Sequence, residues 1–522
     1  MDPRRDDLLV VLAALIPLAL YLLREHAIAG ASGFPLDDSW IHLHFARNLA
    51  EGAGFAYNPG TLVAGSTAPL WTLLLAAGAL VFGASAVTVK TIGVASMLGA
   101  ALLSRRAALA WGASRGVALA AAVALVWMGP LVWGALSGME VCLAALLVAA
   151  ALRAHAGGRA GWTALWGALA VLARPEALLL VPLCALGRPL TLRRALVFGV
   201  VTLVVVAPAV AFTLWTVGAL VPATAAAKIE GGLVGWITGV SEPLAQSLVA
   251  RPWAFLCEWV VWLARTHWLL PLALAPAIVL AWVRHGRTLG VPALGLLVHP
   301  LGMALLAPYR GPGFQEGRYS THLLPLALIV IAAAVSPGAV GATSRVVVAG
   351  AARPASAVGG LQQMLSGSAS WFSRANVIAV VVYLVIGLAT LPAAATRYAW
   401  GVQNINAMQV HLGHWVDANV PKAARLAVND IGAIAYFSRR QVIDLMGLVT
   451  PEIIPYRRQG EAQVMRYVIT ACPDYVIIFP AWFPVMASRA DLLVPVYRVR
   501  LARNEVAGGP EMVVYRLVRC TV

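Results

Sequence analysis

The sequence contains 522 residues, of which 61% are hydrophobic and only 11% charged, and its mean hydropathy is +0.81. This composition excludes an ordinary soluble enzyme and is typical of a polytopic membrane protein. The net charge of +16 comes from arginines that lie between apolar runs, which is the positive-inside pattern. Because no basic, aromatic-interleaved soluble module accompanies them, we expect no nucleic-acid binding.

The first apolar run, residues 8–23, follows the basic start MDPRR and lacks a convincing cleavage site, so it predicts an uncleaved signal anchor. Placing the Arg-rich loops in the cytoplasm gives about 11 spans. The later ones are expected at 87–104, 116–133, 140–152, 161–173, 176–187, 195–217, 267–283, 289–307, 321–335 and 375–391. Several are shorter than the roughly 20 residues of a perpendicular crossing, which favours tilted or half-length helices around a cavity.

Residues 24–86 are predicted to form one large extracytoplasmic loop with interfacial helices. The adjacent acids Asp37 and Asp38 open a segment in which polar residues recur at i, i+3, i+4 and i+7, as on one wet helical face. The apolar run 69–82 is expected to be re-entrant or interfacial, because a full span there would invert every later Arg-rich loop.

The composition changes near residue 392. Short β-rich runs at 425–428, 441–445, 475–479, 493–501 and 512–518 predict a small extracytoplasmic α/β domain over 392–522, after a membrane domain over 1–391. Residues 336–374, rich in Gly, Ser and Arg, are predicted to be a cytoplasmic linker. Cys472 and Cys520 fall in the external domain, where they either pair in an oxidising compartment or stay free.

Two adjacent carboxylates at a membrane surface have more than one interpretation. Asp37 or Asp38 can cap the helix that begins near Ser39, a common use of Asp. Alternatively, one carboxylate takes a proton from a sugar hydroxyl while the other orients it or holds a divalent cation. His42, one turn beyond Asp38, either tunes it or packs at the interface.

Isolated charges at the ends of short spans favour the chemical interpretation. An ionisable group at such a position is a candidate for function, although an ion pair or a snorkelling side chain explains any single one. Together they place cations on the same face as the acids, which suits a phosphate leaving group beside a hydroxyl nucleophile. The residues concerned are Glu140, Arg174, Glu176, Lys228, Arg318 and Tyr319.

The layout resembles the GT-C superfamily of integral-membrane glycosyltransferases, which use polyprenyl-phosphate sugars as donors. The resemblance covers the whole membrane part, and within the superfamily the chain is most similar to actinobacterial cell-wall arabinofuranosyltransferases. The motifs that carry it are LDD at 36–38 with the helix after it, GFAYNPG at 54–60, GSTAPLW at 65–71, SGME at 137–140, ARPEA at 173–177, GRYSTHLLP at 317–325 and NDIGAIAYF at 429–437.

The resemblance implies an inverting mechanism and a set of roles. Asp37 matches the usual base, and Asp38 would assist it or bind a cation. Arg174 and Lys228, with Arg318 as a third, match cations near the donor phosphate. Glu140 matches an acid that contacts the acceptor or a metal, and His44 stands where many relatives have Arg. Substrate contacts are therefore expected at Glu140, His42, His44, Glu176 and Tyr319, and any metal at Asp38 and Glu140.

The sequence therefore predicts a glycosyltransferase of the bacterial plasma membrane, with its active site outside the cytoplasm. It would move a sugar, with arabinofuranose as one candidate, from a polyprenyl-phosphate donor to a cell-envelope glycan or glycolipid. A secondary transporter shares the spans, broken helices and intramembrane charges. A lipid-linked glycan ligase or phosphotransferase on the same scaffold is a third interpretation.

Overall fold

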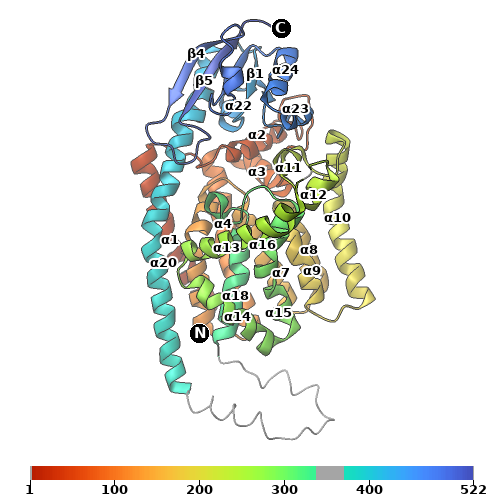
Figure 1. Cartoon of the computed structure of the whole chain (residues 1–522). Coiled ribbons are helices and arrows are strands. Elements are labelled where there is room, and N and C mark those ends of the chain that lie inside the picture. Colours follow the sequence, from red (N-terminus) through yellow and green to blue (C-terminus); the bar gives the residue numbers. More distant parts are fainter. Residues whose placement is uncertain (1–2, 241, 337–368, 521–522) are drawn as a thin grey trace.

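The chain forms an α-helical bundle with a small α/β domain at one end (Figure 1), as described for residues 3–240, 242–336 and 369–520 of a computed structural model. Within these residues seven helices are long and apolar enough to cross a membrane, or eight if the bent pair α5 and α6 is one span. Five shorter apolar helices accompany them. The chain is thus a multi-pass membrane protein of the predicted fold class.

The first half of the bundle is built from the following helices: α1 (Pro3–Ala29), α2 (Asp38–Ala50), α3 (Pro69–Phe82), α4 (Ala86–Ala110), α5 (Arg115–Val126), α6 (Gly129–Leu136), α7 (Val141–Ala156), α8 (Ala160–Ala173), η1 (Pro175–Leu179), α9 (Leu180–Leu186) and α10 (Leu192–Val217). The second half contains α11 (Ala223–Lys228), α12 (Gly232–Ile237), η2 (Gln246–Ala250), α13 (Arg251–Thr266), α14 (Leu270–His285), α15 (Arg287–Ala293), α16 (Gly295–Leu306), α17 (Phe314–Gly317), η3 (Thr321–Leu323), α18 (Leu324–Val335) and α20 (Ala369–Ile405).

The predicted spans map onto these helices in three ways. Long candidate spans overlap the predicted spans 8–23, 87–104, 195–217, 289–307, 321–335 and 375–391, and the bent pair overlaps 116–133. The predicted spans 140–152, 161–173, 176–187 and 267–283 coincide with the shorter apolar helices, as expected for half-length elements around a cavity. The 14-residue α3 is likewise too short for a perpendicular crossing.

One candidate span, Gln246–Thr266, was not predicted from the sequence. Its hydropathy of 1.2 is the lowest of the seven, because Arg251, Glu258 and Arg265 interrupt it. In Figure 1 α13 lies across the long helices rather than along them. This orientation, together with its charges, is that of an interfacial helix.

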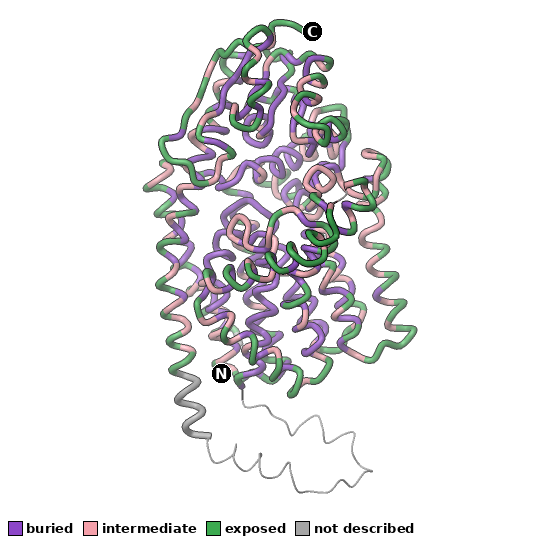
Figure 2. The backbone as a smooth tube through the Cα atoms, viewed as in Figure 1, coloured by how far each residue is buried: buried purple, intermediate pink, exposed green. Residues whose placement is uncertain are grey.

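The core of the bundle is formed by its inner helices. Residues of α6, α7 and α18 are buried along most of their length, whereas in α10 only Phe198 and Thr213 are buried (Figure 2). Small residues permit this close packing: in α7 Ala144, Ala145, Ala149 and Ala151 are at most 2% exposed.

The α/β domain contains a five-stranded mixed sheet of order β2-β1-β3-β5-β4. The strands β1 (Arg425–Val428), β2 (Gln441–Asp444) and β3 (Tyr475–Ile478) are parallel, and β4 (Leu493–Arg500) and β5 (Glu511–Leu517) are antiparallel, in agreement with the predicted β-rich runs. Its helical elements are η5 (Asn406–Val410), α21 (His411–Asn419), α22 (Gly432–Ser438), η6 (Pro451–Ile453), α23 (Ile454–Arg458), α24 (Glu461–Ala471) and α25 (Pro484–Ala487).

The boundary between membrane domain and α/β domain is not a break in the chain. The predicted boundary at residue 392 falls inside α20, which runs to Ile405 and continues through η5 and α21 as one 42-residue apolar-to-polar helix, Ile378–Asn419. Most of the predicted linker 336–374 lies outside the described residues, and its last residues, from Ala369, belong to α20.

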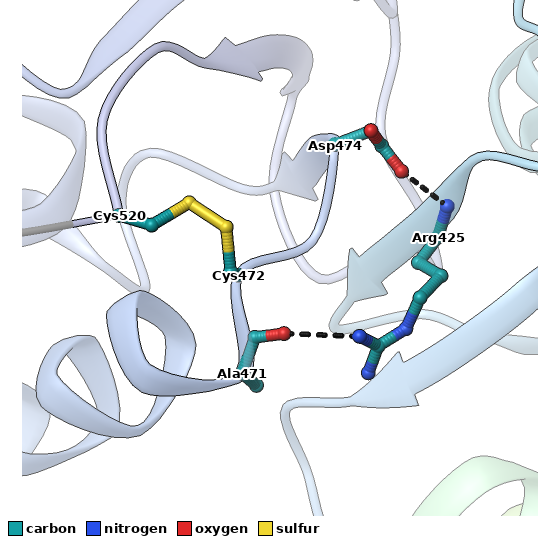
Figure 3. Close-up of a disulfide and its surroundings, with 5 residues drawn as sticks. All are labelled: Arg425, Ala471, Cys472, Asp474 and Cys520. Atoms are coloured by element: carbon teal, nitrogen blue, oxygen red, sulfur yellow. Dashed lines mark hydrogen bonds between the residues drawn. A yellow bond between two sulfur atoms is a disulfide. The ribbon is translucent and has the colours of Figure 1, made fainter.

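A disulfide joins Cys472 and Cys520, whose Cα atoms are 5.4 Å apart (Figure 3). It ties the end of the chain to the turn between α24 and β3. In the same turn Asp474 accepts a hydrogen bond from the backbone amide of Arg425, and the Arg425 guanidinium donates to the carbonyl of Ala471.

Candidate functional site

The loop before α2 is anchored by a buried cluster at the end of α1. The carboxylate of Glu25 accepts hydrogen bonds from the backbone amide of Gly33 at 3.0 Å and from Lys90 Nζ of α4 at 2.5 Å. Tyr398 of α20 donates to the same carboxylate. Because three elements converge on one acid, the position of the chain entering Asp37 and Asp38 is fixed by the bundle.

A cavity of about 540 Å³ opens below the α/β domain, and we call it the central cavity. It is formed by α2, the segment after it, the junctions α6–α7 and α8–η1, α11, α16 and the loop before α18. Eight of the ten residues predicted for the site line it: Asp38, His42, Glu140, Arg174, Glu176, Lys228, Arg318 and Tyr319. The sequence-based grouping of charges from distant spans is therefore a spatial grouping as well.

Asp38 lies between two cations. One of its carboxylate oxygens, Oδ2, accepts a hydrogen bond from Arg318 Nη1 at 2.9 Å and another from Lys228 Nζ at 3.4 Å. Burial alone would raise the pKa of Asp38, but Lys228 and Arg318 hold that pKa well below its usual range. The Asp38 side chain is still 31% exposed, so a ligand in the central cavity can reach it.

Arg174 is neutralised on two sides. Its guanidinium donates to Glu140 and, at 3.1 Å, to Glu176 Oε2, and it lies 4.6 Å from the centre of the Tyr319 ring. Glu140 also faces His42, whose Nε2 is 3.5 Å from the second carboxylate oxygen. Two carboxylates around one buried guanidinium leave no excess positive charge at this end of the cavity.

Asp37 points away from the central cavity and toward the α/β domain. Its carboxylate accepts hydrogen bonds from the backbone amides of Gly432 at 2.6 Å and Ala433 at 2.8 Å, at the start of α22. The acid does not cap its own helix, although it occupies the N-cap position of α2. Asp37 thus caps α22 instead of α2, and its partner Gly432 lies 395 residues later in the chain.

The Asp37 contact depends on a glycine. A Cβ atom at position 432 would lie 2.1 Å from the carbonyl oxygen of Asp37 and 2.8 Å from its carboxyl carbon. Burial raises the pKa of Asp37 well above its usual value, and the nearby charge of Asp430 raises it further, against the effect of the Ala433 and Gly432 amides. These features make Asp37 a contact between two domains.

His44 also lies outside the central cavity. Its Nε2 hydrogen-bonds the carbonyl of Tyr57 at 2.8 Å, and its Nδ1 accepts from Arg47 at 3.0 Å. Burial, with the charge of Arg47, lowers the pKa of His44 to about 3, so the ring is neutral near pH 7. The predicted substrate contact at His44 does not fit this placement, because both ring nitrogens hold the loop after α2 in shape.

Several lining residues were not predicted from the sequence. Arg310 is exposed, contacts the rings of Tyr309 and Phe314, and has no carboxylate partner among the described ion pairs. Ser66 lies 3.4 Å from His42 Nδ1, and Thr224 donates to the carbonyls of Gly65 and Leu448. Arg310 and Arg318 both belong to the polar segment PYRGPGFQEGRY, residues 308–319. This second arginine in the same loop is the sequence feature from which Arg310 could have been predicted.

The acids of the cavity do not fit a divalent metal. Asp38 is bonded to Arg318 and Lys228, and Glu140 to Arg174, so their oxygens are already neutralised by cations. Within the described part of the chain, no group of three or more His, Cys, Asp or Glu residues is placed to hold a metal ion. The predicted metal ligands Asp38 and Glu140 therefore serve as ion-pair partners here.

Several solved membrane-protein structures share this architecture. ArnT from Cupriavidus metallidurans in the apo state aligns with a TM-score of 0.60 and 14% identity over 97% of each chain. ArnT bound to undecaprenyl phosphate aligns with a TM-score of 0.56 and 15% identity, over 98% of this chain and 99% of that one. The chain has the GT-C fold. The GT-C oligosaccharyltransferase of Archaeoglobus fulgidus has a TM-score of 0.57 at 11% identity, over 99% of this chain and 74% of its own.

The remaining comparisons concern sequence. Residues 403–515 match a family model described as a domain of unknown function, DUF8728, so the match covers the α/β domain. A search among curated proteins finds no match.

Proposed function

We propose that the protein is an inverting glycosyltransferase that moves a sugar from a polyprenyl-phosphate donor to a hydroxyl of a glycan or glycolipid. The observation that carries the proposal is the arrangement of Asp38 between Arg318 and Lys228 in a cavity that a ligand can enter. The GT-C fold supports the reaction class, and the undecaprenyl phosphate bound to ArnT supports the class of carrier.

The donor phosphate binds at the end of the cavity where positive charge is in excess. Arg318 and Lys228 share a single carboxylate, and Arg310 adds a third cation without an acidic partner among the described residues. Arg174, in contrast, is already surrounded by Glu140 and Glu176. We therefore assign the phosphate to Lys228, Arg310 and Arg318, and Arg174 to holding Glu140 in place.

Asp38 acts as the base. As the acceptor oxygen bonds to the anomeric carbon, the bond from that carbon to the phosphate oxygen breaks and the hydroxyl proton passes to the Asp38 carboxylate. The polyprenyl phosphate leaves with its charge stabilised by the three cations. Donor binding also draws Arg318 and Lys228 toward the phosphate, which raises the pKa of Asp38 toward its ordinary range and strengthens it as a base.

The other residues of the site position these groups. His42 lies between Asp38 and Glu140 and presents Nε2 to the Glu140 carboxylate. The ring of Tyr319 lies against the Arg174 guanidinium, and its hydroxyl oxygen accepts a hydrogen bond from Arg318. Asp37 fixes the start of α2 against α22. We thus move the role of base from Asp37 to Asp38 and assign Asp37 as a positioning residue.

The finer identity of the reaction is part of the same proposal. The location is a bacterial plasma membrane, with the α/β domain and the central cavity outside the cytoplasm, and the disulfide supports an oxidising compartment. The acceptor belongs to the cell envelope, and arabinofuranose is the candidate sugar suggested by the sequence motifs.

A reconstituted assay tests the proposal. The purified protein in lipid nanodiscs is given polyprenyl-phosphate-linked pentoses and hexoses with lipid-linked and free glycan acceptors, and glycosylated product and released polyprenyl phosphate are quantified by mass spectrometry. We expect a single sugar to be transferred with inversion, and transfer by Asp38→Asn to be about 10²–10⁴-fold slower. Transfer of an intact oligosaccharide would identify a ligase, and uptake of solute into proteoliposomes without product would identify a transporter.

A further inference from the structure

A second cavity lies between the α/β domain and the loop after α2, and we call it the interdomain cavity. Its volume is about 300 Å³, at the lower end of small-molecule sites. It is formed by residues 58–63 of the loop, Thr216 at the end of α10, the edge of the sheet at β1 and β2, the segment Val449–Glu452 and Tyr467 of α24.

Its polar side chains are available to a ligand. In the described residues, the side chains of Thr61, Gln441, Glu452 and Tyr467 make no hydrogen bond within the protein. Sheet register places Gln441 directly beside Arg425 on the neighbouring strand. An amide, a hydroxyl, a carboxylate and a guanidinium therefore face one space, and together they offer both donors and acceptors.

The cavity suits a neutral, hydroxyl-rich ring. Arg425 and Glu452 are its only charged lining residues in the described chain, and their charges cancel, so the site does not select an anion. Tyr467 is half-buried and held by the Tyr456 ring at 5.1 Å between centroids, which gives a fixed apolar face beside the polar groups. A saccharide has this combination of apolar ring face and hydroxyl edge.

A thin wall separates this cavity from the central cavity. Val63 and Val449 line the interdomain cavity, whereas Gly65 and Leu448 line the central one. The two segments touch, since a Cβ atom on Gly65 would lie 2.8 Å from Val449 and 3.0 Å from the Leu448 carbonyl.

Helix α11 braces this wall. Thr224 donates to the carbonyls of both Gly65 and Leu448, and Ala223 N donates to the Ala64 carbonyl at 3.1 Å. One turn further along, the same helix carries Lys228 into the central cavity. The spacing between the two cavities is therefore fixed by the helix that also supplies a cation to the proposed phosphate site.

We infer that the interdomain cavity binds a sugar unit of an extended glycan acceptor, while the accepting hydroxyl of that glycan reaches Asp38 in the central cavity. This inference rests on the proposed glycosyltransferase function. It makes the enzyme select acceptors of more than one sugar unit, through contacts from Gln441, Glu452 and Tyr467.

The test compares acceptors of different length. Octyl glycosides of single sugars and of the corresponding trisaccharides, in pentofuranose and hexopyranose series, are presented to the full-length protein in nanodiscs. Binding is measured by saturation-transfer NMR and competition, and transfer is measured separately. The variant is Gln441→Ala with Glu452→Gln, and its control is Gln463→Ala with Glu511→Gln, which changes the same residue types outside both cavities.

We expect at least one trisaccharide to bind, and the double variant to weaken that binding about tenfold without changing donor KM or transfer to single-sugar acceptors. The control should behave as the wild type. Trisaccharide binding that the variant weakens, in a protein that transfers no sugar, would support the cavity while removing the glycosyltransferase. Transfer that depends on Asp38 but shows equal KM for short and long acceptors, or no effect of the double variant, would overturn the inference alone.

Discussion

Arg318 donates to the carboxylate of Asp38 at 2.9 Å, although 280 residues separate the two in the chain. The contact joins the first residue of α2 to the loop before α18, and Lys228 completes it from α11. In the proposed reaction Asp38 is the base and its two cations also attract the donor phosphate, so this contact would couple donor binding to activation of the acceptor.

The two neighbouring acids should differ in function. Asp38→Asn removes the proposed base, so kcat should fall by about 10²–10⁴-fold. Asp37→Asn keeps an oxygen that can accept from the Gly432 or Ala433 amide, and kcat should fall less than about tenfold. Steady-state kinetics with both variants measures the difference, with folding checked by size-exclusion chromatography. Equal losses in the two variants would place Asp37 in the chemistry and contradict the assignment.

Substitutions of Arg310 and Arg174 should have different effects, because we assign the first to the donor phosphate and the second to holding Glu140 in place. Arg310→Gln removes an exposed cation of the phosphate site, so donor KM should rise about 10-fold, the effect of losing one charge-assisted hydrogen bond, while the protein stays folded. Arg174→Gln leaves the buried Glu140 and the partly exposed Glu176 without their cation, which should destabilise the fold by about 3–5 kcal/mol. Donor titrations and thermal unfolding in detergent distinguish the two. A stable Arg174→Gln protein with only a raised donor KM would return Arg174 to the phosphate.

Gly432 should resist substitution. In Gly432→Ala the new methyl group would meet the Asp37 carbonyl, so α22 must move away from α2. We expect a lower melting temperature and at least a tenfold loss of transfer, although position 432 contacts no proposed substrate atom. The control is Gly460→Ala, where a Cβ meets nothing within 4 Å but the positive φ of +104° adds strain. If Gly432→Ala were as active as the wild type, the docking of α22 on Asp37 would not matter for the site.

The folding stability of the region where α2 meets the α/β domain should depend on pH. Burial raises the pKa of Asp430 to about 6, with further contributions from nearby acids, against its hydrogen bond from Gln409. Since the folded state holds this proton more tightly than the unfolded chain, the stabilising contribution is complete below about pH 4 and is lost as the pH rises through 6. Asp430→Asn should therefore raise the melting temperature by roughly 2–4 °C at pH 7.5 and leave it unchanged at pH 4. Asp491→Asn, at an exposed ion pair, is the control.

Reduction should weaken the α/β domain. The Cys472–Cys520 bond closes a loop with a sequence separation of 48 residues, and the entropy of such a loop corresponds to about 4 kcal/mol of stabilisation. Cys472→Ser with Cys520→Ser should lower the melting temperature of the domain, and dithiothreitol should act only on the wild type. A reductant effect that persists in the double variant would point to another cause.

Much of the fold follows from local pattern. The strands were predicted within one or two residues because alternating and β-branched runs are bounded by turn residues, as in Tyr475–Ile478. The helix α13 was missed because Glu258 and its neighbours reduce its hydropathy. The continuity of α20 into the α/β domain was also missed, since a change of composition along a helix resembles a domain boundary.

The sequence predicts most of the charged residues that line the central cavity, but not the directions in which the neighbouring side chains point. Charges that interrupt apolar runs identified Arg174, Lys228 and Arg318, because such side chains are tolerated only where they face a cavity or a partner. Asp37 and Asp38 point in opposite directions because Asp37 contacts α22. The sequence around residue 37 contains no feature that predicts this contact. The position of His44 outside the central cavity could not be predicted for the same reason, because its partner Tyr57 belongs to a loop of irregular shape.

The hydrogen bonds from Gly432 and Ala433 to Asp37 can form only late in the synthesis of the chain. The ribosome must add 395 further residues after Asp37 before its partner exists, and that partner must be delivered to the same side of the membrane. A partly synthesised chain would contain every proposed cation yet lack a fixed catalytic loop. Such a chain would therefore carry out the proposed reaction poorly until α22 has folded against α2.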